Sequence, residues 1–279
     1  MGASSAAAFA PKQGALLGGG RVGPARTPNH LDVDFTTIRI SEDGKSLHFY
    51  GDWPALCGDG RSVTANVDRV APIQPDGSFF AAGLLTSATA VGTFELGGRL
   101  ARTSIGGQQL EIASGTGRSQ FALRTGRITC KTPLVAWQVR SAPRVVGPPT
   151  PKRGAPYFGS DDQTDPVVLR VSRDGRSIVQ AGVEFGLDCK HKRFLFASDL
   201  VPGATIRRDG SFSSTQRYRS APGDARFGAG NLARFTAVFE GRFGASTVAG
   251  SLRVGVRVVG KAGALADTCS SFTRFAASL

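Results

Sequence analysis

The sequence predicts an all-β protein made of two tandem antiparallel β-meander domains, each of them a sandwich or a flattened barrel. Three observations predict this fold class: an internal repeat, alternation of apolar and polar residues, and Asp-Gly pairs between the alternating runs. The chain of 279 residues holds 37 Gly and 15 Pro, as expected for strands joined by turns. No extended stretch shows the spacing of an amphipathic helix.

The internal repeat is carried by landmarks that recur in the same order in both halves of the chain. Two Asp-Gly pairs and two cysteines recur in both halves. The corresponding landmarks are Asp43-Gly44 and Asp174-Gly175, Asp76-Gly77 and Asp209-Gly210, Cys57 and Cys189, and Cys130 and Cys269. Because domains of roughly 100–150 residues can each bury a core, the sequence predicts two copies of one folding unit.

Composition suggests where the copies begin and end. The start of the chain is rich in Ala, Gly and Pro and lacks periodicity, so we expect a disordered leader or a residual signal region. Ala8-Phe9-Ala10 fits the small-residue pattern of a cleavage site, but no charged and apolar segment precedes it, so the signal peptide is expected to be incomplete in this sequence. The expected regions are a leader at 1–30, β-domain 1 at 31–141, a Pro-rich linker at 142–153 and β-domain 2 at 154–279.

Strand-like alternation is clearest in the second copy. The run 167–172 is largely apolar at odd positions, and the run 233–243 gathers three Phe on one face. Along 247–258 every second residue from Val248 is apolar or Gly, while Ser, Arg and Gly fill the other face. This period of two indicates half-buried strands. The Asp-Gly pairs between such runs favour hairpins with type I′ turns, since Gly adopts positive φ without steric cost.

The four cysteines allow three pairings, and the repeat selects among them. Equivalent spacing in the two copies favours Cys57 with Cys130 and Cys189 with Cys269. Each such disulfide would add roughly 4 kcal/mol to stability in the chain-entropy treatment, and would require an oxidising compartment. Four reduced core thiols are the alternative. A zinc site is disfavoured because the sequence has no C-x-x-C.

The second copy opens with Gly154-Ala-Pro-Tyr157-Phe-Gly159 and carries two Asp-Gly turns and two cysteines. In these features it resembles a widespread bacterial β-domain found in uncharacterised, mostly exported proteins. The resemblance is weaker in the first copy, where Tyr157 has no clear counterpart but Cys130 to Trp137 matches the usual Cys-plus-Trp ending. The resemblance implies export and an all-β fold, and it carries no catalytic residues across.

Catalytic and cofactor motifs are scarce. The chain has three histidines, His30, His48 and His191, and no G-x-S-x-G, so a hydrolytic triad is not expected. The Asp-Gly carboxylates are explained by turns, and the cluster 161–165 lacks the spacing of a calcium loop. No glycine-rich loop opens a helix that could receive a phosphate. We therefore expect no enzyme activity, no metal and no cofactor.

Two groups of residues are candidates for ligand contact. Tyr50, Asp52 and Trp53 combine aromatic rings with a carboxylate, a composition suited to sugar or peptide binding. The alternative is that Phe49 and Trp53 fill the sheet core near Cys57. The second group consists of Arg207, Arg208, Arg217 and Arg219 in the second copy, where most of the net charge of +13 falls. A basic face for a polyanion and a scatter of exposed charges are both compatible with this pattern.

These observations favour a non-catalytic, exported binding or structural module that acts at the cell envelope or outside the cell. The first alternative is a secreted carbohydrate-active enzyme with an unrecognised carboxylate pair. The second is a polyanion-binding module that uses the basic second domain. The partner is unknown, with a cell-envelope polymer or another exported protein as candidates. Nucleic acid is disfavoured by the expected export, and no stretch has the roughly 20 apolar residues of a membrane span.

Overall fold

The computed structural model confirms the all-β fold class, and the chain divides into two compact units. Unit 1 comprises Met1–Gly23 and Asp32–Ser141, and unit 2 comprises Pro24–Leu31 and Ala142–Leu279. Each unit is described by itself below. The residues that the structure describes are 9–22, 33–87, 90–124, 128–191, 195–200, 203–220, 227–228, 230–260 and 263–279. Among them, no helix is long and apolar enough to span a bilayer.

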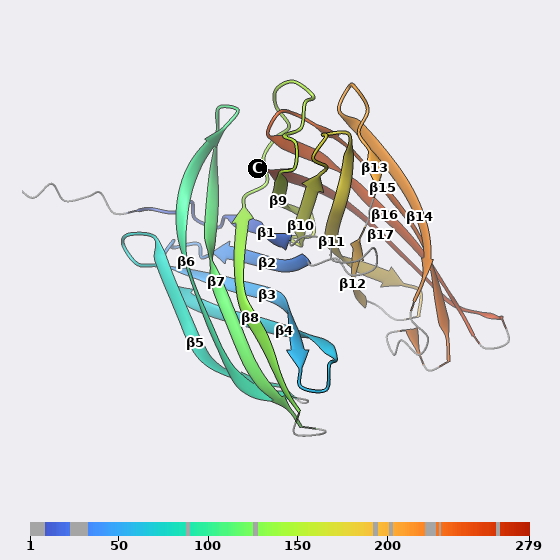
Figure 1. The fold of residues 1–279 in the computed structure, drawn as a ribbon, viewed down its shortest axis with the longest axis horizontal. Coiled ribbons are helices and arrows are strands. Elements are labelled where there is room, and N and C mark those ends of the chain that lie inside the picture. Colours follow the sequence, from blue (N-terminus) through green and yellow to red (C-terminus); the bar gives the residue numbers. More distant parts are fainter. Residues whose placement is uncertain are drawn as a thin grey trace, which may run out of the picture. The chain divides into compact units, whose positions relative to one another are not determined.

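Unit 1 is one antiparallel sheet of eight strands (Figure 1). The order across the sheet is β4-β3-β2-β1-β8-β7-β6-β5. The strands are β1 Leu16–Val22, β2 Val33–Ile40, β3 Ser46–Cys57, β4 Ser62–Pro72, β5 Ser78–Thr86, β6 Ala90–Ile105, β7 Gln108–Leu123 and β8 Thr129–Arg140.

Unit 2 repeats this arrangement with the order β12-β11-β10-β9-β17-β16-β15-β14, and the short β13 pairs with β11. Figure 1 shows these strands in yellow-green to red. The strands are β9 Pro156–Asp161, β10 Pro166–Val171, β11 Ser177–Cys189, β12 Leu195–Leu200, β13 Ala204–Thr205, β14 Ser211–Arg219, β15 Leu232–Phe243, β16 Thr247–Val259 and β17 Leu265–Ser278.

Each sheet curls so that two non-neighbouring strands meet at one end. In unit 1, β3 pairs with β2 along its first half, and its last residues Leu56 and Cys57 pair with Lys131 and Cys130 of β8. In unit 2, β11 meets β17 in the same way. The cysteines stand directly opposite each other and form the two predicted disulfides, Cys57–Cys130 and Cys189–Cys269. One face of each curled sheet therefore encloses an apolar core.

The first copy begins earlier than composition suggested. Strand β1 lies inside the expected leader and pairs with both β2 and β8. The segment before it, Pro11-Lys12-Gln13-Gly14-Ala15, matches Pro151-Lys152-Arg153-Gly154-Ala155 before β9. The Gly14 amide donates to the Ser41 carbonyl (3.3 Å), and the Gly154 amide donates to the Ser172 carbonyl (2.9 Å). The run Gly18-Gly19-Gly20 hid this strand, because glycine is depleted in strands and shows no alternation of apolar and polar side chains.

The same alignment finds the missing partner of Tyr157. Leu17 stands three residues after Gly14, as Tyr157 stands three residues after Gly154, and both side chains are fully buried. The tyrosine hydroxyl reaches a polar partner, since it accepts a hydrogen bond from the Lys152 amide (2.9 Å). An aliphatic side chain fills the same position in unit 1 without needing one.

The expected proline linker is hydrogen-bonded to unit 2. The Val146 amide donates to Thr247 Oγ1 (3.0 Å), and the Ala245 amide donates to the Val146 carbonyl (3.3 Å). Pro149 lies against the turn at Gly210, where an added Cβ would meet it at 2.6 Å. Prolines keep the segment extended, and the extended segment packs along the end of the sheet as part of unit 2.

The four Asp-Gly pairs of the repeat form turns, but of a different type from the one expected. Gly44, Gly77, Gly175 and Gly210 have φ between 70° and 84°, whereas the only described non-Gly residue with positive φ is Thr164. The amide of each glycine donates to the carbonyl three residues earlier. Each Asp therefore sits at the last central position of a type I-like turn, followed by Gly in the left-handed region, as in longer hairpin loops.

We expect the unit 1 disulfide to contribute about 4 kcal/mol to the free energy of unfolding, because it closes a loop of 73 residues. Both tryptophans of the chain, Trp53 and Trp137, lie in the core of unit 1, so their fluorescence reports the unfolding of this unit. Urea titration of Cys57→Ala with Cys130→Ala should show the lower stability. The matched variant Cys189→Ala with Cys269→Ala should move the tryptophan transition little. Equal midpoints for wild type and the first variant would contradict the expectation.

Candidate functional site

The aromatic group around Trp53 is divided between the two faces of β3. Burial alternates along the strand, and Phe49 and Trp53 are both fully buried. Their rings meet edge to face with centroids 5.7 Å apart, and Phe49 also meets Trp137 at 5.3 Å. The prediction that Trp53 contacts a ligand is therefore wrong, and the alternative that Phe49 and Trp53 fill the core agrees with the structure. Strand alternation is the physical reason.

Tyr50 and Asp52 lie half-buried on the other face of β3. The register places Tyr50 opposite Asp68 and Asp52 opposite Asn66 on β4. Asn66 Nδ2 donates to Asp52 Oδ1, and His48 Nε2 lies 2.5 Å from Asp68 Oδ1. The result is a polar strip with one aromatic ring. The carboxylates of Asp52 and Asp68 are bonded to the side chains of Asn66 and His48, so the polar groups of this strip bond to one another across β3 and β4.

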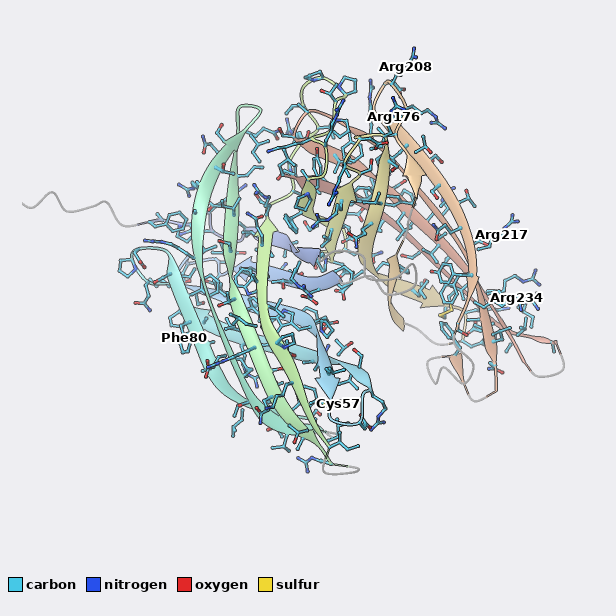
Figure 2. All side chains as sticks on the ribbon, in the orientation of Figure 1. Cys57, Phe80, Arg176, Arg208, Arg217 and Arg234 are labelled. Atoms are coloured by element: carbon cyan, nitrogen blue, oxygen red, sulfur yellow. A yellow bond between two sulfur atoms is a disulfide. The ribbon has the colours of Figure 1, made fainter. Side chains whose placement is uncertain are left out.

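Trp53→Ala should destabilise unit 1 by about 3–5 kcal/mol, because it empties a fully buried site. The remaining Trp137 reports unfolding by fluorescence. The matched control is Phe80→Ala, since Phe80 is an aromatic residue on β5 that is 62% exposed (Figure 2). This control should change stability by no more than about 0.5 kcal/mol. A Trp53→Ala protein as stable as Phe80→Ala would show that the tryptophan is not part of the core.

The acidic cluster of unit 2 is a turn anchored by one buried carboxylate, Asp161. Asp161 Oδ1 accepts hydrogen bonds from the amides of Gln163 (2.9 Å) and Asp165 (2.8 Å), and Oδ2 meets Thr273 Oγ1 of β17 (2.5 Å). Thr273 Oγ1 also lies 2.8 Å from Asp162 Oδ1. The single hydroxyl proton of Thr273 can be donated to only one of the two carboxylates. When Asp161 is protonated, it donates to Thr273 Oγ1 and Thr273 donates to Asp162, so both contacts are hydrogen bonds. These contacts tie the β9–β10 turn to β17.

Burial raises the pKa of Asp161 to about 6, against the hydrogen bonds that act to lower it. Burial and the nearby Asp161 charge raise the pKa of Asp165 to about 7. Because both values exceed the ordinary 3.8, the folded state holds protons that the unfolded chain has released. The stabilisation is therefore complete below about pH 3.8 and is lost progressively as the pH rises from there through 6 to 7.

Thermal unfolding should accordingly show unit 2 less stable at pH 8 than at pH 5. Asp161→Asn imitates the protonated acid, since its Oδ1 can accept both backbone amides and its Nδ2 can donate to Thr273. This variant should weaken the pH dependence and raise the melting temperature at pH 8. Asp209→Asn is the control, because Asp209 is an exposed turn carboxylate with a lowered pKa. The same pH dependence in wild type and Asp161→Asn would refute the assignment.

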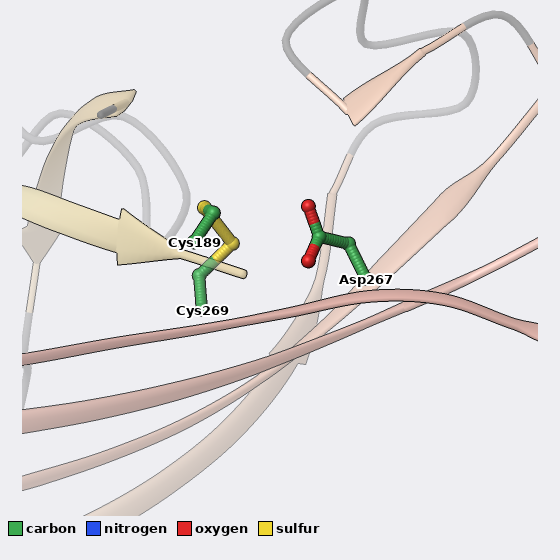
Figure 3. A group of neighbouring side chains, drawn as sticks. All are labelled: Cys189, Asp267 and Cys269. Carbon is green, nitrogen blue, oxygen red and sulfur yellow. A yellow bond between two sulfur atoms is a disulfide. The ribbon is translucent and has the colours of Figure 1, made fainter. Parts of the chain in front are cut away.

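Cys189, Asp267 and Cys269 bring potential metal-ligand atoms within 4.8 Å of one another. Figure 3 shows the two sulfurs joined, so no thiolate is present to bind an ion. The Asp267 carboxylate instead accepts hydrogen bonds from the amides of His191 (3.2 Å) and Thr268 (2.8 Å). Although slight burial acts to raise it, the pKa of Asp267 is lowered by its hydrogen bonds with His191 and Thr268. These hydrogen bonds hold His191, just after β11, against the first residues of β17 beside the Cys189–Cys269 disulfide.

The predicted Arg217 and Arg219 belong to a larger basic surface on unit 2. Both are exposed on β14, and Arg219 stands opposite Arg234 on β15. Arg234 in turn stands opposite Arg257 on β16. Three arginines thus form a row across three neighbouring strands, which are about 4.8 Å apart. Figure 2 labels Arg217 and Arg234 on this part of unit 2.

A depression lies beside this row. The next row consists of Arg217, Thr236, Gly255 and Ser270. A Cβ added at Gly255 would meet no atom within 4 Å, so the middle of the row is open. The associated hollow has a volume of about 750 Å³ and is lined by Arg217, Arg219, Arg234 and Arg257, among other residues.

An aromatic residue borders the depression. Arg253 stands opposite the exposed Phe272 of β17, and the guanidinium carbon of Arg253 lies 5.5 Å from the centre of that ring. Arg274 approaches the same ring at 5.3 Å. We call the surface formed by Arg217, Arg219, Arg234, Arg253 and Arg257 the arginine face.

Among the described residues, none of these five arginines takes part in an ion pair, whereas Arg102 and Arg118 of unit 1 do. Like charges directly opposite each other destabilise a sheet by a few tenths of a kcal/mol or more. The repulsion between these arginines therefore lowers the stability of the sheet, and a bound anion would offset that repulsion.

Unit 1 shows what the same positions hold in the other copy. Ser78 pairs with Arg99 as Ser211 pairs with Arg242, and this register identifies the equivalent residues. Leu84, Thr86, Val91 and Ala122 stand where unit 2 has Arg217, Arg219, Arg234 and Arg257. The fifth equivalent, Arg118, is paired with Glu95 at 2.6 Å. The fold therefore does not require arginine at the first four of these positions.

Arg207 and Arg208 do not join the arginine face. They lie in the turn between β13 and β14, where Arg207 Nη1 donates to Ser211 Oγ (3.3 Å) and Arg208 is exposed. About 20 Å of extended strand separates Ser211 from Arg217. Sequence analysis missed Arg234, Arg253 and Arg257, because only the register of β14, β15 and β16 brings them beside Arg219. The spacing of Arg253 and Arg257 by four residues places both on one face of β16, and this is the signal that could have found these two.

Comparisons with known proteins add little. No family model matches the chain, and no curated protein matches it. A solved structure from Nitrosomonas europaea, described as "a putative AttH (NE1406)", aligns over 94% of this chain and 90% of its own with 9% identity and a TM-score of 0.24. A similarity that low carries no argument about fold or function.

Proposed function

We propose that this chain is a non-catalytic, exported tandem β-domain protein whose unit 2 binds an anionic polymer of the cell envelope through the arginine face. The row Arg219, Arg234 and Arg257 is the observation that carries the proposal. Three guanidinium groups stand in register on an exposed sheet face, and none forms an ion pair among the described residues.

The geometry suits an extended polymer. Arginines are spaced by about 4.8 Å across the strands and by roughly 6.7 Å between alternate residues along a strand. Guanidinium forks donate two parallel hydrogen bonds to phosphate or carboxylate groups. Thr236 and Ser270 add hydroxyl groups next to the open position at Gly255. An open surface of this kind can contact several successive anionic groups of a chain.

The chemistry of the face supports binding without catalysis. Arginine remains protonated at all physiological pH values and therefore cannot act as a general base. The two disulfides favour an oxidising, extracellular setting. An envelope polymer that carries phosphate or carboxylate groups is thus a more suitable partner than nucleic acid.

The test is binding of the oxidised full-length protein to polyphosphate and to polygalacturonate at several salt concentrations. Arg234→Gln with Arg257→Gln should weaken polymer binding at least about tenfold at low salt. It should also reduce the slope of log affinity against log salt concentration by about one for each arginine–anion pair that the substitutions remove. The matched control is Arg39→Gln with Lys45→Gln, which removes two exposed positive charges from unit 1. Equal weakening by both variants would contradict a localised site.

A further inference from the structure

We propose a second binding site in unit 2, separate from the arginine face, for a compact oxyanion with two or more phosphoryl groups. The site is the hollow between the Asp174-Gly175 turn, the Arg207-Arg208 turn and the proline segment before β9. We call it the turn pocket. Its volume is about 670 Å³, within the usual range for small-molecule sites. Its lining includes four arginines, Arg153, Arg176, Arg207 and Arg208, and one carboxylate, Asp174.

Four arginines from three separate segments line the turn pocket. Arg153 comes from the proline segment, Arg176 from the β10–β11 turn, and Arg207 and Arg208 from the β13–β14 turn. All four are exposed. Figure 2 shows Arg176 and Arg208 at the same end of unit 2, away from Arg217 and Arg234. A ligand in the hollow would meet guanidinium groups from more than one side, unlike a polymer lying on a flat face.

Backbone hydrogen bonds hold the three segments together. The Ile206 amide donates to the Arg176 carbonyl (2.8 Å), which joins the two turns directly. The Gly154 amide donates to the Ser172 carbonyl (2.9 Å), which joins the proline segment to the first turn. The side chain of Arg153 runs across this turn, since a Cβ at Gly175 would lie 3.0 Å from Arg153 Cγ. The pocket is therefore formed before a ligand arrives, which lowers the entropic cost of binding.

Positive charge in the pocket greatly exceeds negative charge. Asp174 is the one carboxylate among the lining residues. Its Oδ1 atom accepts hydrogen bonds from Ser172 Oγ (2.5 Å) and from the Arg176 amide (3.0 Å). These turn contacts leave one negative charge beside four guanidinium groups. A phosphoryl group offers three oxygens to such forks, so a ligand with two or more of them matches the excess.

Unit 1 has the same scaffold without the charge. The Ile73 amide donates to the Lys45 carbonyl (2.9 Å), as Ile206 does to Arg176. The positions of Arg153, Arg176, Arg207 and Arg208 are held in unit 1 by Gln13, Lys45, Gln74 and Pro75. The turns therefore form with one positive charge instead of four. The arginines of unit 2 add chemistry that the backbone does not need.

The experiment is calorimetric titration of the oxidised full-length protein with tripolyphosphate, with citrate as a carboxylate comparison. Wild type should bind tripolyphosphate at one site and citrate at least about tenfold more weakly. Arg176→Gln with Arg207→Gln should weaken tripolyphosphate binding at least about tenfold, since it removes two charge-assisted hydrogen-bonding groups. The matched control Lys45→Gln changes the equivalent turn of unit 1 and should have no effect.

Two further variants keep the test decisive. Arg208→Gln removes an exposed guanidinium for which the structure shows no hydrogen bond to another described residue, so it should weaken binding even if the double variant folds poorly. Arg234→Gln with Arg257→Gln should bind tripolyphosphate like wild type, and the turn-pocket variants should retain polymer binding. This separates failure of the turn pocket from failure of the proposed function. Absence of wild-type binding, retained binding in both turn-pocket variants, or equally tight citrate binding would overturn the proposal.

Discussion

Closure of each sheet onto itself is the constraint on which the rest of the structure depends. β3 and β8, and likewise β11 and β17, are separated by two strands in the sheet order, yet they pair at one end where a disulfide joins them. This closure gives each sheet an inside and an outside. Strand alternation then assigns every second residue to the core. Trp53 is fully buried and Tyr50 half-buried for this reason alone.

Much of this arrangement could be predicted from the sequence. The repeat paired the cysteines correctly, and the period of two along 233–243 and 247–258 marked β15 and β16. The start of the first copy could not be read from composition, because β1 carries three glycines at Gly18 to Gly20 and little apolar character. Two of the five residues of the arginine face, Arg217 and Arg219, were identified from the sequence. Its other members lie on different strands, and register depends on turns and bulges that periodicity does not determine.

The two copies separate what the fold needs from what one copy has added. Inner positions keep their character, as with Phe79 and Phe212 after the second Asp-Gly pair, which are both buried. Outer positions are free to change, and unit 2 has arginine at four places where unit 1 has Leu84, Thr86, Val91 and Ala122. The turn pocket differs from its unit 1 equivalent in the same way. Positive charge has accumulated on one copy of a shared scaffold, and the anion binding that we propose would account for both surfaces.

Covalent labelling of arginine with a dicarbonyl reagent, read by mass spectrometry with and without an anionic polymer, tests this account most directly. The account predicts that polymer protects Arg217, Arg219, Arg234 and Arg257 from modification. Exposed arginines of unit 1, such as Arg39 and Arg61, should react equally in both conditions. Protection spread evenly over both units, or no protection in unit 2, would contradict the claim that the second copy has become the anion-binding one.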